Sequence, residues 1–105
     1  MLFTSVKVFA QQAGSIRGTA YDKDFDAPLS GVQVLAVETG AKVQTGDDGH
    51  YVFDLVAPGR YTLVFTRDGY VRQVKADVVV TAGQLTDLDV WLSGEFTELD
   101  EVIVQ

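Results

Sequence analysis

The sequence predicts an all-β domain, a seven-stranded Greek-key β-sandwich, and three observations lead to it. Apolar and polar residues alternate with a period of two in successive short runs, and turns rich in Gly, Asp and Pro separate these runs. No segment shows the 3.6-residue period of an amphipathic helix. The 105 residues are enough for one domain. Because a sheet with one apolar face must be covered and no helix is predicted, we expect a second sheet to cover it.

Seven runs carry the alternation, at residues 15–21, 32–38, 42–45, 50–55, 60–66, 70–80 and 85–93. Short turns such as 46–49, of the Asp-Gly kind, favour antiparallel pairing of neighbouring strands. The phase of the alternation points Leu55 inward together with the core residues of its strand, and likewise Val74 and Ala76. The side chains predicted to form the core are Ile16, Ala20, Val32, Val34, Ala36, Tyr51, Phe53, Tyr61, Leu63, Phe65, Val78, Val80, Leu88, Val90 and Leu92.

Composition excludes several classes of function. The formal charge of −7 repels phosphate backbones and anionic lipids, so we expect no nucleic-acid partner. There is no Cys, and the one His, His50, falls on the outward phase of its strand, where we expect it at the solvated surface. A zinc site needs three or four ligands, and no motif for a nucleophile or a phosphate loop is present. The sequence therefore predicts a binding or spacer module without catalytic residues, metal or cofactor.

Three motifs stand in order along the chain: GSIRGTAYD at 14–22 with PLSGVQV at 28–34, TGDDGHYVF at 45–53, and APGRYTL at 57–63 followed by Gly-Tyr at 69–70. Over residues 14–93 the sequence resembles the carboxypeptidase-regulatory-like family, whose fold is a transthyretin-like sandwich. Gly49 and Gly59 suit turn positions with positive φ, and Tyr61 and Tyr70 suit large aromatics at the rim of a core. The resemblance is to an accessory domain and implies no catalytic residue.

Residues 94–105 form an acidic tail that ends in aliphatic residues. The segment 99–104 resembles the short box that precedes the plug of TonB-dependent outer-membrane receptors, many of which carry a regulatory-like domain before it. This resemblance implies a periplasmic domain at the outer membrane, followed by the remainder of a receptor. The residues expected to bind a TonB-like energy transducer are Asp100, Glu101, Val102, Ile103 and Val104. The alternative is a tail that is disordered or pairs at a sheet edge.

Residues 1–13 are predicted to be the remnant of an export signal or a flexible N-terminal segment, because the small-x-small pattern at 8–10 is typical of a signal-peptidase site. The alternative is an edge strand over residues 2–9. If that segment is retained, we expect its β-prone sequence to pair with an unpaired sheet edge, in its own domain or in a second chain by strand exchange.

The second function class is a free-standing extracytoplasmic adhesion or carbohydrate-binding sandwich that binds through loops 22–31 and 46–49 at one end. Calcium between the acids of 22–26 and 47–48 is a further alternative, although 22–33 lacks the Gly and Glu of a complete calcium loop. Trp91, on the outward phase, is expected to be covered by the tail or stacked on a cross-strand neighbour, the alternative being an exposed anchor for a partner.

Overall fold

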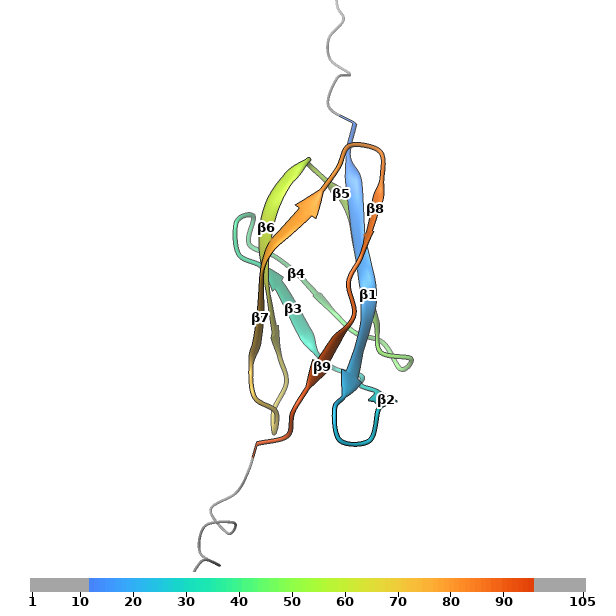
Figure 1. Ribbon diagram of the computed structural model, residues 1–105, viewed down its shortest axis with the longest axis vertical. Helices are drawn as coiled ribbons and strands as arrows, with labels where there is room; N and C mark the ends of the chain where they lie inside the picture. Colours follow the sequence, from blue (N-terminus) through green and yellow to red (C-terminus); the bar gives the residue numbers. More distant parts are fainter. Residues whose placement is uncertain (1–11, 96–105) are drawn as a thin grey trace, which may run out of the picture.

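Two β-sheets packed face to face make up the domain (Figure 1). The computed structural model describes residues 12–95. Within them there is no helix, and so none that is long and apolar enough to cross a membrane. The strands are β1 (Gly14–Asp22), β2 (Ala27–Pro28), β3 (Gln33–Ala36), β4 (Ala41–Gln44), β5 (His50–Val56), β6 (Gly59–Thr66), β7 (Gln73–Val80), β8 (Leu85–Asp87) and β9 (Val90–Leu92).

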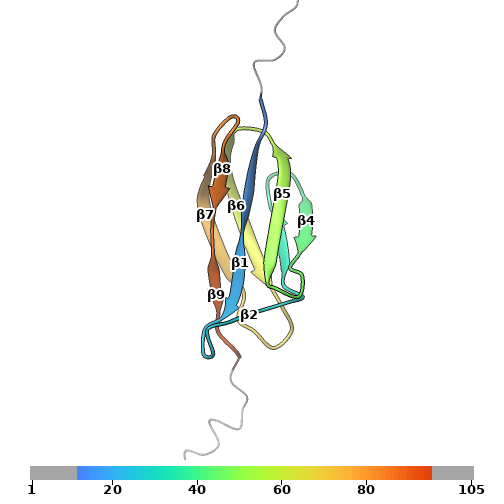
Figure 2. The ribbon, with the colours of Figure 1, turned by 90° about the vertical axis from the view of Figure 1, so that its right-hand side faces the viewer.

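The first sheet is built around β1, and the second has the order β4-β3-β6-β7. Strand β5 pairs antiparallel with one edge of β1, while β8 and β9 pair parallel with β1 and β2 pairs antiparallel with its end. Figure 2 shows β8, β9, β1 and β5 in one layer, with β4 and β6 behind. The chain crosses between the layers after β2, β4, β5 and β7. The all-β sandwich predicted from the sequence is confirmed.

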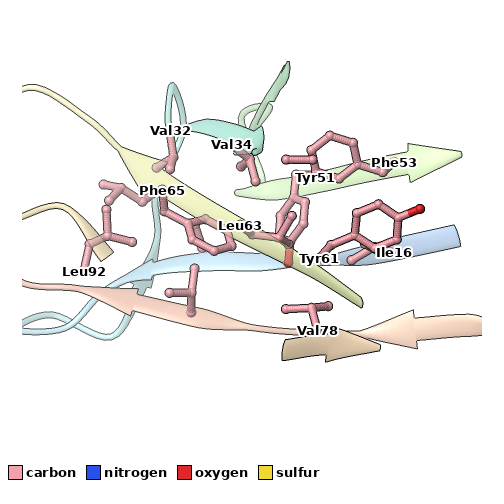
Figure 3. Close-up of a cluster of buried hydrophobic side chains, with 14 of the residues drawn as sticks. Ile16, Val32, Val34, Tyr51, Phe53, Tyr61, Leu63, Phe65, Val78 and Leu92 are labelled. Atoms are coloured by element: carbon pink, nitrogen blue, oxygen red, sulfur yellow. The ribbon is translucent and has the colours of Figure 1, made fainter. Parts of the chain in front are cut away.

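The space between the sheets is filled by the side chains that the alternation predicted to be inward (Figure 3). Phe65 is fully buried, and its ring meets Tyr51 edge to face with centroids 5.5 Å apart. Leu88 is partly buried and packs against the rest. The other predicted core residues are all buried, namely Ile16, Ala20, Val32, Val34, Ala36, Tyr51, Phe53, Tyr61, Leu63, Phe65, Val78, Val80, Val90 and Leu92.

The predicted phase was wrong for three side chains, and β-bulges explain each error. Leu55 is 86% exposed and has a φ of 55°, and the β1–β5 register shifts beside it. Asp77 has a φ of 58°, and the β6–β7 register shifts between Tyr61 and Leu63. Because one extra residue moves every side chain beyond it to the other face, Val74 and Ala76 are exposed although Val78 and Val80 are buried.

The prediction of seven strands also needs correction, since the described residues form nine. Ala27–Pro28 pairs with the end of β1 inside the segment predicted to be a loop. The run 85–93 divides into β8 and β9, because the chain at Leu88 passes directly over Gly18. We call Leu88 and Asp89, the two residues between β8 and β9, the crossing. A Cβ built on Gly18 would lie 1.8 Å from the carbonyl oxygen of Leu88, so only glycine fits beneath the crossing.

The described chain enters and leaves the sandwich at opposite ends. Because β8 and β9 run parallel to β1, the last strand ends at the pole where β1 ends, and not where β1 begins. Figure 1 shows the start of β1 at the top of the molecule and the end of β9 at the bottom. The sandwich therefore separates the point where the chain enters it, at Gln12, from the point where the chain leaves it, at Glu95.

Candidate binding surface

The residues predicted to bind a TonB-like partner, Asp100 to Val104, lie outside the described residues, as does the segment 2–9. The structure does describe how the tail begins. Val71 donates its N–H to the carbonyl of Ser93 at 2.8 Å, and Glu95 donates its N–H to the carbonyl of Gly69 at 2.9 Å. A β-bridge joins Tyr70 to Gly94 between these bonds. The chain is thus fixed up to Glu95 to the loop that joins β6 to β7.

The loop after β1 is organised by Asp22, which is buried. One carboxylate oxygen accepts the N–H groups of Asp24 at 2.8 Å and Phe25 at 3.1 Å, and the other accepts the hydroxyl of Tyr70 at 2.5 Å. These bonds favour the charged carboxylate, and the Tyr70 hydroxyl above all holds the pKa of Asp22 below its ordinary value. The same bond raises the pKa of Tyr70, over whose ring the Arg67 guanidinium lies at 5.3 Å. Asp22 therefore links the loop after β1 to the loop between β6 and β7.

An aromatic cluster, Tyr21, Phe25 and Trp91, lies at the same end of the sandwich. Tyr21 and Trp91 are cross-strand neighbours with rings stacked 5.0 Å apart at 18°. Trp91 also donates its indole N–H to Asp26 at 3.0 Å, which ties β9 to the loop. The predicted cross-strand stacking of Trp91 is confirmed, although 43% of this residue remains exposed.

Phe25 is the most unusual member of this cluster, because it is 80% exposed although the backbone that carries it is held by Asp22. Neither Phe25 nor Tyr21 was predicted from the sequence as a partner-binding residue. A large apolar residue within the otherwise polar loop 22–26 is the signal that could have found Phe25. A fixed, exposed aromatic on a loop is the kind of side chain that anchors a partner.

The loop at 46–49 lies against the loop 22–31. Gly49, with a φ of 79°, accepts the N–H of Ala20 at 2.9 Å, and a Cβ on Gly49 would lie 3.1 Å from the Pro28 side chain. The two loops named for the adhesion alternative are therefore neighbours. At the tip, Asp48 accepts from the side chain and backbone N–H of His50, and both bonds lower the pKa of Asp48. His50 is exposed, as predicted.

The acidic loops do not assemble a metal-ligand cluster in the part of the chain that is described. Over residues 12–95, no group of three or more His, Cys, Asp or Glu side chains is placed to hold an ion. Asp22, Asp26 and Asp48 accept hydrogen bonds from the protein instead. This end of the sandwich therefore presents aromatic side chains beside acidic ones.

This architecture, two β-sheets packed face to face with the loops 22–31 and 46–49 together at one pole, places the chain in the class of β-sandwich domains. Residues 15–93 match the family described as carboxypeptidase regulatory-like domain. The chain belongs to this family, as the three sequence motifs indicated. Comparison with curated protein sequences gives no match.

Solved structures with a similar fold are parts of larger proteins. A crystal structure of a type II cohesin–X-dockerin complex from Acetivibrio cellulolyticus matches with a TM-score of 0.63 and 26% identity, over 73% of this chain and 52% of that one. The Bacillus anthracis TIE protein matches with a TM-score of 0.65 and 22% identity, over 79% of this chain and 17% of that one. A putative carbohydrate binding protein from Bacteroides uniformis matches with a TM-score of 0.60 and 17% identity, over 77% and 41%. This chain thus spans about half or less of the length of these proteins.

Proposed function

We propose that this chain is a non-catalytic periplasmic domain at the N-terminal side of a TonB-dependent outer-membrane receptor, where it acts as a spacer or docking module. The observation that carries the proposal is the box-like segment 99–104, which follows shortly after the family match ends at residue 93. The geometry agrees with such a place in a longer protein. The tail starts from the pole opposite to Gln12, so the sandwich holds the segments on its two sides apart (Figure 1).

The side chains of this domain support a non-catalytic role. The chain has no Cys, and its one His is exposed and bonded to Asp48. Asp22, whose pKa is lowered, is already bonded to Tyr70 and two backbone N–H groups, so it is not free to act as a general base.

Docking would proceed by addition of a strand. Val102, Ile103 and Val104 are β-branched residues that favour an extended backbone. An extended segment that joins the edge of a partner's sheet satisfies its N–H and C=O groups there, with little demand on side-chain identity. The acidic residues before it, Asp100 and Glu101, would favour a partner with basic groups beside that edge.

The test is binding of the full chain to the C-terminal domain of a periplasmic TonB protein. Proline at position 102 removes an N–H donor, so Val102→Pro should abolish binding, while the matched variant Val102→Thr, which keeps the donor and a β-branched side chain, should bind nearly as well as wild type. Both variants should unfold at the wild-type temperature. Binding that survives Val102→Pro, or a melting temperature that falls as far as for a core substitution, would refute the docking strand.

A second candidate is supported by the aromatic cluster. A free-standing adhesion or carbohydrate-binding sandwich would use Phe25, Tyr21 and Trp91 as stacking surfaces at the pole that also carries the loops 22–31 and 46–49. It is tested by glycan-array binding of the full chain, the Phe25→Ala variant and a chain that lacks residues 99–105. Loss of binding in Phe25→Ala with no effect of the deletion favours this candidate, whereas absence of glycan binding by wild type rejects it.

A further inference from the structure

The first and last strands of the described domain are hydrogen-bonded neighbours that run in the same direction. Strand β1 pairs with β8 from Ser15↔Leu85 to Arg17↔Asp87, and with β9 from Ala20↔Val90 to Asp22↔Leu92. Tension on the two ends of the domain would pull β1 toward its start and β9 toward its end. Because these directions are opposite and lie along the strands, the two strands would be sheared past each other and not peeled apart.

Shear loads the whole β1–β8–β9 ladder at once. Beyond the paired residues, the ladder is extended at one end by the N–H of Ser15, which donates to Gln84 at 3.1 Å. At the other end the N–H of Lys23 donates to Leu92 at 2.9 Å. In a sheared ladder the bonds share the load and must break together, whereas in a peeled ladder they break one after another. The geometry therefore gives resistance along the axis that joins the two ends of the domain.

The gap between β8 and β9 is closed by bonds that continue this connection. Leu88 donates its N–H to Arg17 at 2.8 Å, and its carbonyl accepts the Tyr51 hydroxyl at 2.6 Å. Asp89 accepts the N–H of Thr19 at 2.9 Å. The strand crossing is thus held to β1 through the centre of the ladder, where Gly18 allows the close approach.

Strand β1 is also held on its other side. It pairs antiparallel with β5 from Gly14↔Val56 to Thr19↔His50, and Tyr51 reaches from β5 to Leu88. Figure 2 shows β1 between β5 on one side and β8 and β9 on the other. Sliding β1 out of the domain therefore requires both of its ladders to break.

We propose that this sandwich has a further function as a load-bearing link, which transmits tension between its two attached segments without unfolding. This function goes beyond docking and does not depend on which partner the tail binds. Its mechanical element is the β1–β8–β9 ladder together with the Leu88–Asp89 crossing.

The first experiment compares two directions of pulling on the full chain by single-molecule force spectroscopy. Since the chain has no Cys, paired cysteine substitutions provide unique attachment points. The pair Gln12→Cys and Glu95→Cys loads the ladder in shear. The matched pair Gln12→Cys and Ala82→Cys attaches both handles at the same end of β1 and β8, and so peels them apart. The shear pair should withstand several times the force of the peel pair, and equal unfolding forces would overturn the proposal.

The second experiment tests the crossing itself. In the shear geometry at constant force, Tyr51→Phe removes one hydroxyl bond to Leu88 and should unfold about fivefold faster, the factor that corresponds to one neutral hydrogen bond. The control is Glu38→Ala, which removes bonds to the N–H and hydroxyl of Thr62 in the second sheet, away from the ladder. Glu38→Ala should leave the rate unchanged. An equal acceleration by both variants, or none by Tyr51→Phe, would show that the crossing does not carry the load.

Discussion

Replacement of Gly18 by alanine should strongly destabilise this domain, because the added methyl group would meet the backbone of Leu88. The Cβ would lie 1.8 Å from the Leu88 carbonyl oxygen and 2.6 Å from its carbonyl carbon. These are backbone atoms, so no side-chain rotation relieves the contact. Cβ atoms in proteins essentially never lie closer than 3.0 Å to such an atom. The backbone at Leu88 would therefore have to move away by roughly 1.2 Å to lengthen the 1.8 Å contact to that limit.

The cost follows from the bonds that such a retreat would break. Two neutral hydrogen bonds, from Leu88 to Arg17 and from Tyr51 to Leu88, contribute about 1 kcal/mol each, and the bond from Thr19 to the Asp89 carboxylate about 1.5 to 3 kcal/mol. Alanine also lowers the conformational entropy of the unfolded chain, which offsets about 0.4 to 1 kcal/mol of this loss. We expect a net loss of about 2.5 to 4.5 kcal/mol, a large part of the stability of a domain of this size.

Urea unfolding followed by fluorescence measures this effect, because the single tryptophan, Trp91, lies on β9 beside the crossing. The control is Gly46→Ala, where the nearest atom is the Asp48 carboxylate oxygen at 3.7 Å, so that stability should stay level or rise by up to about 1 kcal/mol. A Gly18→Ala variant whose free energy of unfolding lies within about 0.5 kcal/mol of wild type would refute the account of the crossing.

Two further predictions concern the core and the acid range. Phe53→Ala should cost about 3 to 5 kcal/mol because Phe53 is buried, whereas Leu55→Ala, two positions along the same strand, should change the urea midpoint little because Leu55 is exposed. Equal losses would mean that the bulge at Leu55 is misplaced. The hydrogen bond from Tyr70 lowers the pKa of Asp22 in the folded state, so its contribution to stability is present above the ordinary carboxyl pKa of 3.8 and is lost as the pH falls below it. Melting temperatures between about pH 6 and pH 3 should therefore fall less for Asp22→Asn than for wild type, and parallel curves would contradict this assignment.

The candidate binding surface was predictable in part from the sequence. The loops 22–31 and 46–49 were identified from their turn residues, and they do lie together. The stacking of Trp91 on a cross-strand neighbour was one of the predicted alternatives, but the identity of that neighbour, Tyr21, depends on the parallel pairing of β1 with β9. The hydrogen bond between Asp22 and Tyr70 joins residues 48 positions apart, so no local sequence pattern predicts it.

The sequence by itself determined the class of the fold, the family and most of the core. Period-two alternation places Tyr51 and Phe53 or Leu63 and Phe65 on the same face, because successive side chains of a strand point to opposite sides. Turn residues between the runs mark where strands end, since they act through local backbone geometry. Such signals lie within a few residues of one another and can be read without knowing the fold.

Only the tertiary structure decided where that alternation breaks and how the last strand joins the first. The bulges at Leu55 and Asp77 arise where two strands differ by one residue in register, which depends on the partner strand and not on the sequence of either alone. The passage of Leu88 over Gly18, and with it the parallel ladder, brings together residues 70 positions apart. Pairing at that range is settled by packing of the whole sandwich, because no local propensity distinguishes a parallel from an antiparallel neighbour.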